Sequence, residues 1–201
     1  MKNKEIERII VERYTTNWAT EFEKLKSVLN DYLKTLIYSI EHVGSTAVPG
    51  LSAKPIIDID VIINNKDGFD KIKTILEKLG YTYCGEMGIP GREAFKRDSP
   101  LTPFDGSGYQ WHQHHLYVCL ENSDSLNNHL RLRDYLRTHL EEAQEYGRLK
   151  TELAARYPND IARYVEAKTA FILQILEKVG FNQEILSKIE LQNKALKPEA
   201  K

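Results

Sequence analysis

Two aspartates inside an apolar run are the residues of this chain with the clearest capacity for chemistry. Residues 56–63 read IIDIDVII, with Asp58 and Asp60 as the charged groups. Alternate side chains of a strand share a face, so the two carboxylates would stand side by side, repel each other and lose hydration. Mg²⁺ or Mn²⁺, which take oxygen ligands, would compensate both charges. An edge strand with solvated aspartates would also explain the pattern.

A small-residue turn precedes this run and favours the metal interpretation. Gly44-Ser45 follows an apolar segment, residues 36–43, which we expect to form a strand. Glycine lets a backbone approach a ligand closely, and amide and hydroxyl groups suit phosphate oxygens. A divalent ion held by Asp58 and Asp60 would bridge to the same phosphate. The turn and the aspartates together predict a site for a phosphate-bearing ligand.

The turn and the aspartate pair also resemble a known superfamily. Val43-Gly44-Ser45, a spacer of twelve residues and then Asp58-Ile59-Asp60-Val61 resemble the signature of the nucleotidyltransferase superfamily. The longer segment EHVGSTAVPGLSAKPIIDIDV resembles the core motif of the GrpB family, and the similarity extends over roughly residues 8–178. The resemblance implies an α+β, nucleotidyltransferase-like fold: a small mixed β-sheet flanked by helices, with a helical C-terminal region. It implies no particular substrate.

Several cationic residues are candidates for contact with a phosphate. They are Lys54, Arg92, Arg133, Lys150 and Lys168. Tyr146 and Tyr164 each stand four residues before a lysine, so each Tyr-Lys pair shares a helix face. The resemblance, in which several of these positions recur, implies one wall of an anion pocket. The alternative is that these long side chains extend to solvent or pair with Asp134 and Glu166.

Histidines are dense at residues 112–115 and invite a metal interpretation. By strand alternation His112 and His114 share one face, whereas His115 and Tyr117 share the other, so the three histidines cannot easily bind one ion. We expect His115 to face the aspartate pair. A histidine-dependent metal hydrolase is a further hypothesis, which requires all the histidines to converge with the aspartates.

A third carboxylate is a feature that the resemblance leads us to expect. Active members of the superfamily generally carry one on a strand beside the aspartate pair. Here the nearest candidates are Glu93 and Glu121, and neither lies inside a clearly apolar strand. The family motif usually has a second histidine where Tyr117 stands. These departures put full catalytic competence in doubt.

Composition bears on the class of partner and on the compartment. The 28 Lys and Arg residues balance 29 Asp and Glu residues, whereas sequence-independent nucleic-acid binding relies on clustered basic charge. We therefore expect no nucleic-acid partner. No apolar run approaches the length that crosses a bilayer, so we expect no membrane association and a cytoplasmic location. Cys84 and Cys119 lack a CxxC spacing and are expected to be reduced.

Hydrophobic periodicity predicts the elements that would position these residues. Helices are predicted at residues 18–33, 67–80, 127–146 and 161–179. Strands are predicted at residues 36–43, 56–63, 92–97 and 116–120, after a strand or ordered arm at residues 6–14. The predicted organisation is a core of residues 1–122, a helical region of residues 123–181 packed on it, and a tail of residues 182–201.

The leading hypothesis is a nucleotidyltransferase-like protein that binds a nucleotide, or another anionic small molecule, through Mg²⁺ or Mn²⁺. Asp58 and Asp60 would hold the metal and act in catalysis, as an acceptor attacks the α-phosphate in line and pyrophosphate leaves. The predicted substrate-binding residues are Gly44, Ser45, Lys54, Arg92, His115, Arg133, Lys150 and Lys168. The alternative is a catalytically silent nucleotide- or anion-binding module.

Overall fold

The computed structural model describes residues 8–194. The α-helices are α1 (Asn17–Leu33), α2 (Phe69–Lys78), α3 (Asp124–Thr138), α4 (Leu140–Arg156), α5 (Ile161–Lys178) and α6 (Gln183–Lys194). The strands are β1 (Ser39–Val43), β2 (Ile57–Ile63), β3 (Tyr81–Gly85), β4 (Arg92–Arg97) and β5 (His114–Leu120). Two 3₁₀ turns, η1 (Lys34–Leu36) and η2 (Ser45–Ala47), precede and follow β1.

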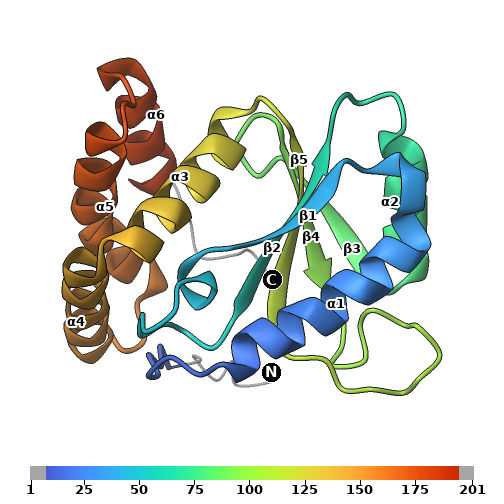
Figure 1. Ribbon diagram of the computed structural model, residues 1–201, viewed down its shortest axis with the longest axis horizontal. Helices are drawn as coiled ribbons and strands as arrows, with labels where there is room; N and C mark the ends of the chain where they lie inside the picture. The colour runs from blue at the N-terminus through green and yellow to red at the C-terminus, as the bar shows by residue number, and fades with distance from the viewer. Residues whose placement is uncertain (1–7, 195–201) are drawn as a thin grey trace, which may run out of the picture.

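The strands within the described residues form a five-stranded sheet in the order β1-β2-β5-β4-β3. β2 and β5 run parallel, whereas the other neighbouring strands are antiparallel. The parallel pair requires a crossover, which α2 and the β3–β4 hairpin supply between β2 and β5 (Figure 1). A mixed sheet with flanking helices confirms the predicted α+β fold.

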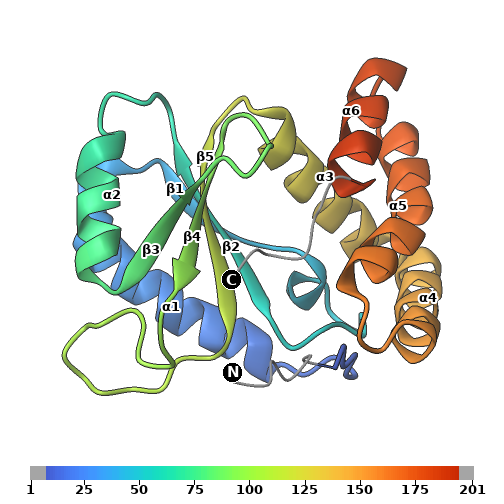
Figure 2. The ribbon, with the colours of Figure 1, turned by 180° about the vertical axis from the view of Figure 1, so that it is seen from behind.

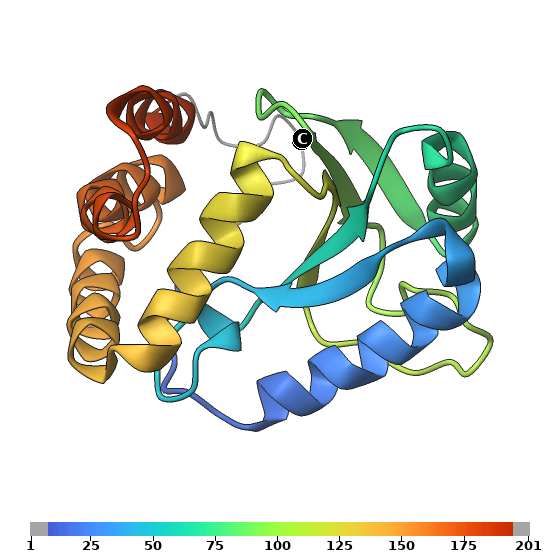
Figure 3. The same ribbon diagram turned by 45° about the horizontal axis from the view of Figure 1, so that its top comes forward.

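Helices lie on both faces of this sheet. α1 and α2 cover one face and build the main core with it. α3 lies on the other face, where Leu126 packs against Ile62 and Cys119. α4, α5 and α6 form a further layer beyond α3 (Figure 2, Figure 3). Helices α3 to α6 therefore stand on the side of the sheet that faces away from α1.

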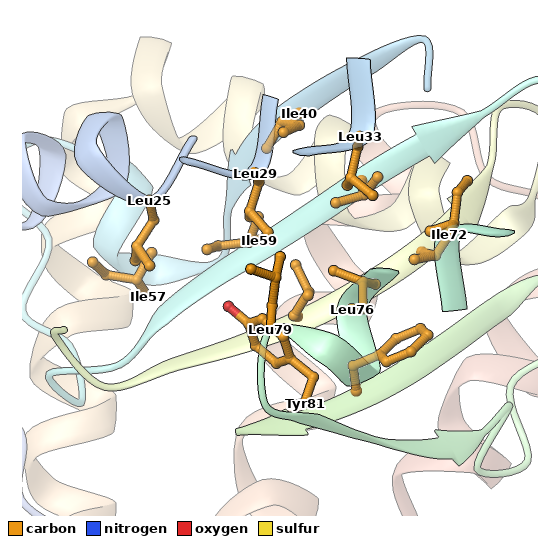
Figure 4. Packing of buried hydrophobic residues seen from close by; sticks show 14 of the residues in the cluster. Leu25, Leu29, Leu33, Ile40, Ile57, Ile59, Ile72, Leu76, Leu79 and Tyr81 are labelled. Atoms are coloured by element: carbon orange, nitrogen blue, oxygen red, sulfur yellow. The ribbon is translucent and has the colours of Figure 1, made fainter. Parts of the chain in front are cut away.

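Alternation along β2 separates the core from the candidate site. Ile57, Ile59 and Val61 point toward α1 and α2 and are fully buried. Leu25 and Leu29 of α1 lie close to Ile57 and Ile59 (Figure 4). Each such side chain contributes roughly 1.5–3 kcal/mol when it leaves water. The apolar face fixes the register of β2, because a slip by one residue would turn the aspartates into this core.

The prediction of one helix over residues 127–146 is wrong. The chain forms two helices instead, α3 and α4, which are separated at His139 with φ −122° and ψ 79°. The His139 ring stacks on Tyr135 with 3.7 Å between ring centroids. No proline or glycine marks the break in the sequence, so the helical periodicity conceals it.

The other predicted elements are present, with shifted ends. β1 begins at Ser39 rather than at residue 36, because η1 occupies the preceding residues, and α2 is shorter than residues 67–80. β4 spans Arg92–Arg97 as predicted. The N-terminal arm forms an isolated bridge from Glu12 to Ala53, and residues 6 and 7 lie outside the described residues. The predicted tail contains α6 and then residues 195–201, which also lie outside that range.

Two further observations concern the expectations about membranes and cysteines. Among the described helices, none combines the length and apolar character that a bilayer-spanning segment needs. Cys84 is exposed, Cys119 is buried, and both are free thiols.

Truncation of the core between α1 and β2 tests the energetic basis of this fold. We expect Leu29→Ala to lower the free energy of unfolding by about 2–5 kcal/mol, because Leu29 is fully buried and a cavity would remain. Leu191→Ala in α6 is the matched control, since Leu191 is 67% exposed. Chemical denaturation of both variants measures the difference. Equal effects at the two positions would contradict the assigned core.

Candidate functional site

Asp58 and Asp60 project together from the face of β2 that points away from the core. In the register of the sheet, Asp58 stands opposite His115 of β5, and Asp60 stands opposite Tyr117. On the other side of β2, Asp60 stands opposite Glu41 of β1. Asp60 is completely buried, whereas 31% of the Asp58 side chain is exposed. The predicted pairing of the two carboxylates on one face is confirmed.

A histidine binds each aspartate. His115 Nδ1 lies 2.9 Å from Asp58 Oδ1, and His129 Nδ1 lies 2.8 Å from Asp60 Oδ2. An ionised carboxylate only accepts hydrogen bonds, so Nδ1 is the donor in both pairs. The expectation that His115 faces the aspartates is confirmed. His129, from α3, was not among the predicted site residues.

These pairs set the protonation of the face of β2 that carries Asp58 and Asp60, which we call the acidic face. Burial acts to raise the pKa of Asp58, but the hydrogen bond of His115 and the positive charges of His115, His129 and Lys168 together outweigh burial, so this pKa lies below its ordinary value. Burial acts to lower the pKa of His129, yet the Asp60 carboxylate outweighs burial and the pKa of His129 is raised. The charged form of His129 is thereby favoured beside the fully buried Asp60.

Gly44 brings the backbone against the aspartate pair. Its φ of +70° lies in the left-handed region that favours glycine, and a methyl group on its Cα would overlap Asp58 Oδ2. Ser45 opens η2 immediately after it and is partly exposed. Glycine at this position thus has a physical cause, namely the close approach of the turn to Asp58. The structure places both predicted turn residues at the Asp58 end of the site.

Three lysines gather at the same end. The Nζ atom of Lys150 is buried without a hydrogen-bond partner among the described residues, 4.5 Å from the centre of the Tyr146 ring. Burial and then the charge of Lys168 lower the pKa of Lys150 well below its ordinary value. Burial and then the charge of Lys54 lower the pKa of Lys168 to about 8, while Asp58 acts to raise the pKa of both lysines. Lys168 is therefore within electrostatic reach of the other two lysines and of Asp58.

α3 presents two further basic residues, Arg133 and Arg137, to the strand and turn that precede β2. Arg133 Nη1 donates to Glu41 Oε2 at 2.7 Å and to the His42 carbonyl at 3.0 Å, and its Nε donates to Asp134. Arg137 Nε donates to the Ala47 carbonyl. Arg133 lies beside the acidic face as expected, but its charge is already balanced by carboxylates. Its predicted contact with a substrate stays a prediction.

Arg92 lies at the opposite end of the acidic face, beyond Asp60. Its guanidinium carbon stands 4.4 Å from the centre of the Tyr117 ring, in a cation–π contact. Its Nε atom is buried and has no hydrogen-bond partner within the described range. Arg92 is therefore separated from the lysines by the aspartate pair, and the predicted cations do not form one continuous wall.

The third carboxylate on this face is Glu41, which the sequence interpretation did not identify. Glu93 pairs with Val118, so it lies on the opposite face, where it binds Lys66 and Tyr83. Glu121 is exposed beyond the end of β5. Neither proposed candidate therefore stands beside the aspartate pair. The antiparallel register of β1 could not be read from Glu41 alone.

The remaining histidines do not join the site. His114 faces the core, where its Nδ1 donates to the His112 carbonyl at 2.8 Å and its Nε2 accepts from the Tyr81 hydroxyl at 2.7 Å. Burial lowers the pKa of His114 to about 4, so the ring is neutral. In the described part of the chain, no group of three His, Cys, Asp or Glu side chains is arranged to hold a metal ion. This geometry does not support the histidine-dependent hydrolase.

Comparison with known proteins identifies the family. The sequence profile described as GrpB protein matches residues 8–178. The chain belongs to the GrpB family. It is 33% identical over 172 residues to the glutamate-rich protein GrpB of Alkalihalophilus pseudofirmus, and the match covers 85% of this chain and 95% of that protein. It is 33% identical over 159 residues to the UPF0157 protein YqkA of Bacillus subtilis, of which it spans 43%, with 79% of this chain matched.

Solved structures agree with this assignment. The crystal structure of the conserved protein GrpB from Enterococcus faecalis has a TM-score of 0.71 and 35% identity, and the match covers 89% of this chain and 98% of that one. A lower structural similarity is found to Cid1. Cid1 in complex with its short product ApU has a TM-score of 0.46 at 12% identity, over 70% of this chain and 40% of that one.

The unpaired lysine provides a test of the site electrostatics. We expect Lys150→Met to raise the free energy of unfolding by about 1–3 kcal/mol, because an apolar side chain of similar length replaces a buried amino group that has no hydrogen-bond partner in the described part of the chain. Lys188→Met is the control, since Lys188 forms an exposed pair with Glu184. Denaturation of both variants at neutral pH measures the two effects. A loss of stability in Lys150→Met would show that Lys150 has a stabilising partner.

The lowered pKa of Lys168 predicts a pH dependence. The unfolded chain binds a proton here up to its ordinary pKa of 10.5, whereas the folded chain releases it near 8, so stability rises with pH between these values. We expect Lys168→Met to stabilise the protein most below pH 8, with the gain declining toward pH 10.5. Denaturation of the wild type and the variant at pH 7, 8.5 and 10 measures this. A gain that does not change with pH would contradict the assignment.

Proposed function

We propose that this GrpB-family protein binds a nucleoside triphosphate through a divalent cation at Asp58 and Asp60. The observation that carries the proposal is the meeting of two carboxylates with three lysines at one end of a single face. A metal–phosphate ligand carries a positive charge for the aspartates and negative charges for the lysines. The cation attracts the aspartates, and the phosphates attract the lysines.

The aspartates fit a divalent cation that is shared with a ligand. Each histidine uses one oxygen of its aspartate, and Asp60 Oδ1 is buried without a hydrogen-bond partner in the described chain. Such an oxygen is costly to leave without a cation or donor. Mg²⁺ commonly binds through one or two carboxylates and completes its shell with water and substrate phosphates. Asp58 and Asp60 would hold the ion, and the ion would neutralise phosphate charge.

The lysines account for the phosphate end of the ligand. Lys150 is buried without a hydrogen-bond partner among the described residues, and the Lys168 amino group is subject to the charges of Lys54 and Asp58. A bound phosphate would supply oxygen acceptors and restore the ordinary pKa values of these amino groups. The Gly44 backbone packs closely against Asp58, so its main-chain groups would lie next to a phosphate held at that end.

Transfer of the nucleotidyl group is the activity that this arrangement supports. The family signature supports it as well, since the Gly-Ser turn directly follows β1 and the aspartate pair lies on the adjacent strand β2. Binding without transfer is the second candidate function. It is favoured by Glu41, the third carboxylate of this face, because Arg133 binds it at 2.7 Å and so competes with any metal ion. Release of pyrophosphate from a bound nucleotide would distinguish transfer from binding alone.

Thermal unfolding with ATP, GTP, CTP and UTP, each with and without Mg²⁺ or Mn²⁺, tests the proposed function. A ligand that binds only the folded state raises apparent stability, by about 2.7 kcal/mol at a free concentration of 100 times Kd. We expect a metal-dependent rise with at least one nucleotide. We expect the double variant Asp58→Asn with Asp60→Asn to lose it, because amides cannot balance the charge of the cation.

Asp31→Asn is the matched control, since Asp31 is exposed on α1 away from the sheet face that carries the aspartates. Circular dichroism establishes that the variants remain folded. A metal-dependent rise that persists unchanged in the double variant would refute the metal site. No rise with any nucleotide would refute the proposed ligand.

A further inference from the structure

His115 is the accessible histidine of the acidic face. Its side chain is 44% exposed, compared with 24% for His129, which binds the fully buried Asp60. It extends from β5 directly opposite Asp58, at the end of the face where the lysines gather. A ligand whose phosphates bind those lysines would therefore place a phosphorus atom next to the His115 ring.

The hydrogen bond to Asp58 prepares this ring for nucleophilic attack. In the neutral ring, Nδ1 carries the proton and donates to Asp58 Oδ1 at 2.9 Å, which leaves the lone pair on Nε2. Within the described residues Nε2 has no hydrogen-bond partner. A base held in one tautomer by a neighbouring carboxylate, with its other nitrogen free, is the arrangement that covalent catalysis requires.

We propose that His115 Nε2 accepts the nucleotidyl group of the bound triphosphate, forming a covalent nucleotidyl-histidine. The inference rests on the proposed function, which does not name the group that attacks the α-phosphorus, and assigns that role to His115. The Nε2 lone pair forms a bond to the α-phosphorus, and the bond from that phosphorus to the oxygen bridging the β-phosphorus breaks. The bonding electrons leave with pyrophosphate. The Nδ1 proton stays in place, and the Asp58 carboxylate balances the positive charge of the substituted ring.

Other nucleophiles near this face are less suited to the step. The Lys150 amino group is buried, with 2% of the residue exposed, so it could donate to a phosphate oxygen that lies against it but could not pass that oxygen to attack the phosphorus atom. Cys119 is fully buried, and burial raises the pKa of its thiol, which opposes the reactive thiolate. Tyr117 is subject to the same effect, because burial raises the pKa of its hydroxyl.

Labelling with nucleotide radioactive at the α-phosphate, together with Mg²⁺ or Mn²⁺, tests this proposal. The nucleotide is the one that stabilises the protein in thermal unfolding. We expect a protein adduct that survives alkali and is lost in acid, as phosphorus–nitrogen bonds to histidine are. Peptide mapping by mass spectrometry should place one nucleoside monophosphate on His115. Nucleotide labelled at the γ-phosphate should leave the protein unlabelled.

His115→Gln should abolish the adduct, because an amide nitrogen is not a nucleophile. It should keep the metal-dependent thermal shift, because the amide N–H can still donate to Asp58 in place of Nδ1. His139→Gln is the matched control, since His139 is exposed at the junction of α3 and α4, and it should label as the wild type does. An adduct that persists in His115→Gln, or one that carries only γ-phosphate label, overturns the proposal. A thermal shift without any adduct overturns it too, yet leaves the proposed function standing. Absence of the shift itself refutes both.

Discussion

The pairing of β2 between β1 and β5 is the constraint on which the rest of the structure depends. One face of β2 is apolar and lies in the core with α1 and α2, and that burial fixes its register. The other face of β2 must then carry the Asp58 and Asp60 carboxylates, and β2 is flanked on both sides by paired strands, β1 and β5. Asp60 has no exposure to water at all. Such a charge persists in a folded protein only beside compensating groups.

The helices that follow the sheet supply that compensation unevenly. At Asp60, His129 forms a hydrogen bond and is favoured in its charged form. At Glu41, Arg133 completes a salt bridge. At the Asp58 end, the Lys150 Nζ atom has no hydrogen-bond partner among the described residues, and burial lowers the pKa of both Lys150 and Lys168. Perturbed groups that the fold leaves uncompensated are typical of sites that bind a charged ligand. Burial of the Lys150 and Lys168 amino groups costs free energy, and a bound anion would remove that cost.

Sequence reasoning recovered the parts of this site that depend on local pattern. Alternation placed Asp58 and Asp60 on one face and His115 with them. Glycine at position 44 was expected to let the backbone approach a ligand, and in the structure the group that it approaches is the Asp58 side chain. His129 and Glu41 were not predicted, because the position of His129 depends on how α3 crosses the sheet and that of Glu41 on the register of β1. A lone histidine in a polar helix gives no signal of its own. The break at His139 was hidden for a related reason, since the residues on either side continue one helical period.

The central claim is that the acidic face holds a metal-bound phosphate ligand. Its most direct test is the paramagnetic broadening of histidine signals by Mn²⁺ in the presence of nucleotide. The ring protons of the histidines would be followed by nuclear magnetic resonance. The account predicts that the His115 and His129 signals broaden strongly once nucleotide and Mn²⁺ are both present, while the His139 signal, from a ring outside the site, stays sharp. Equal broadening of all histidines, or none at His115 and His129, would contradict it.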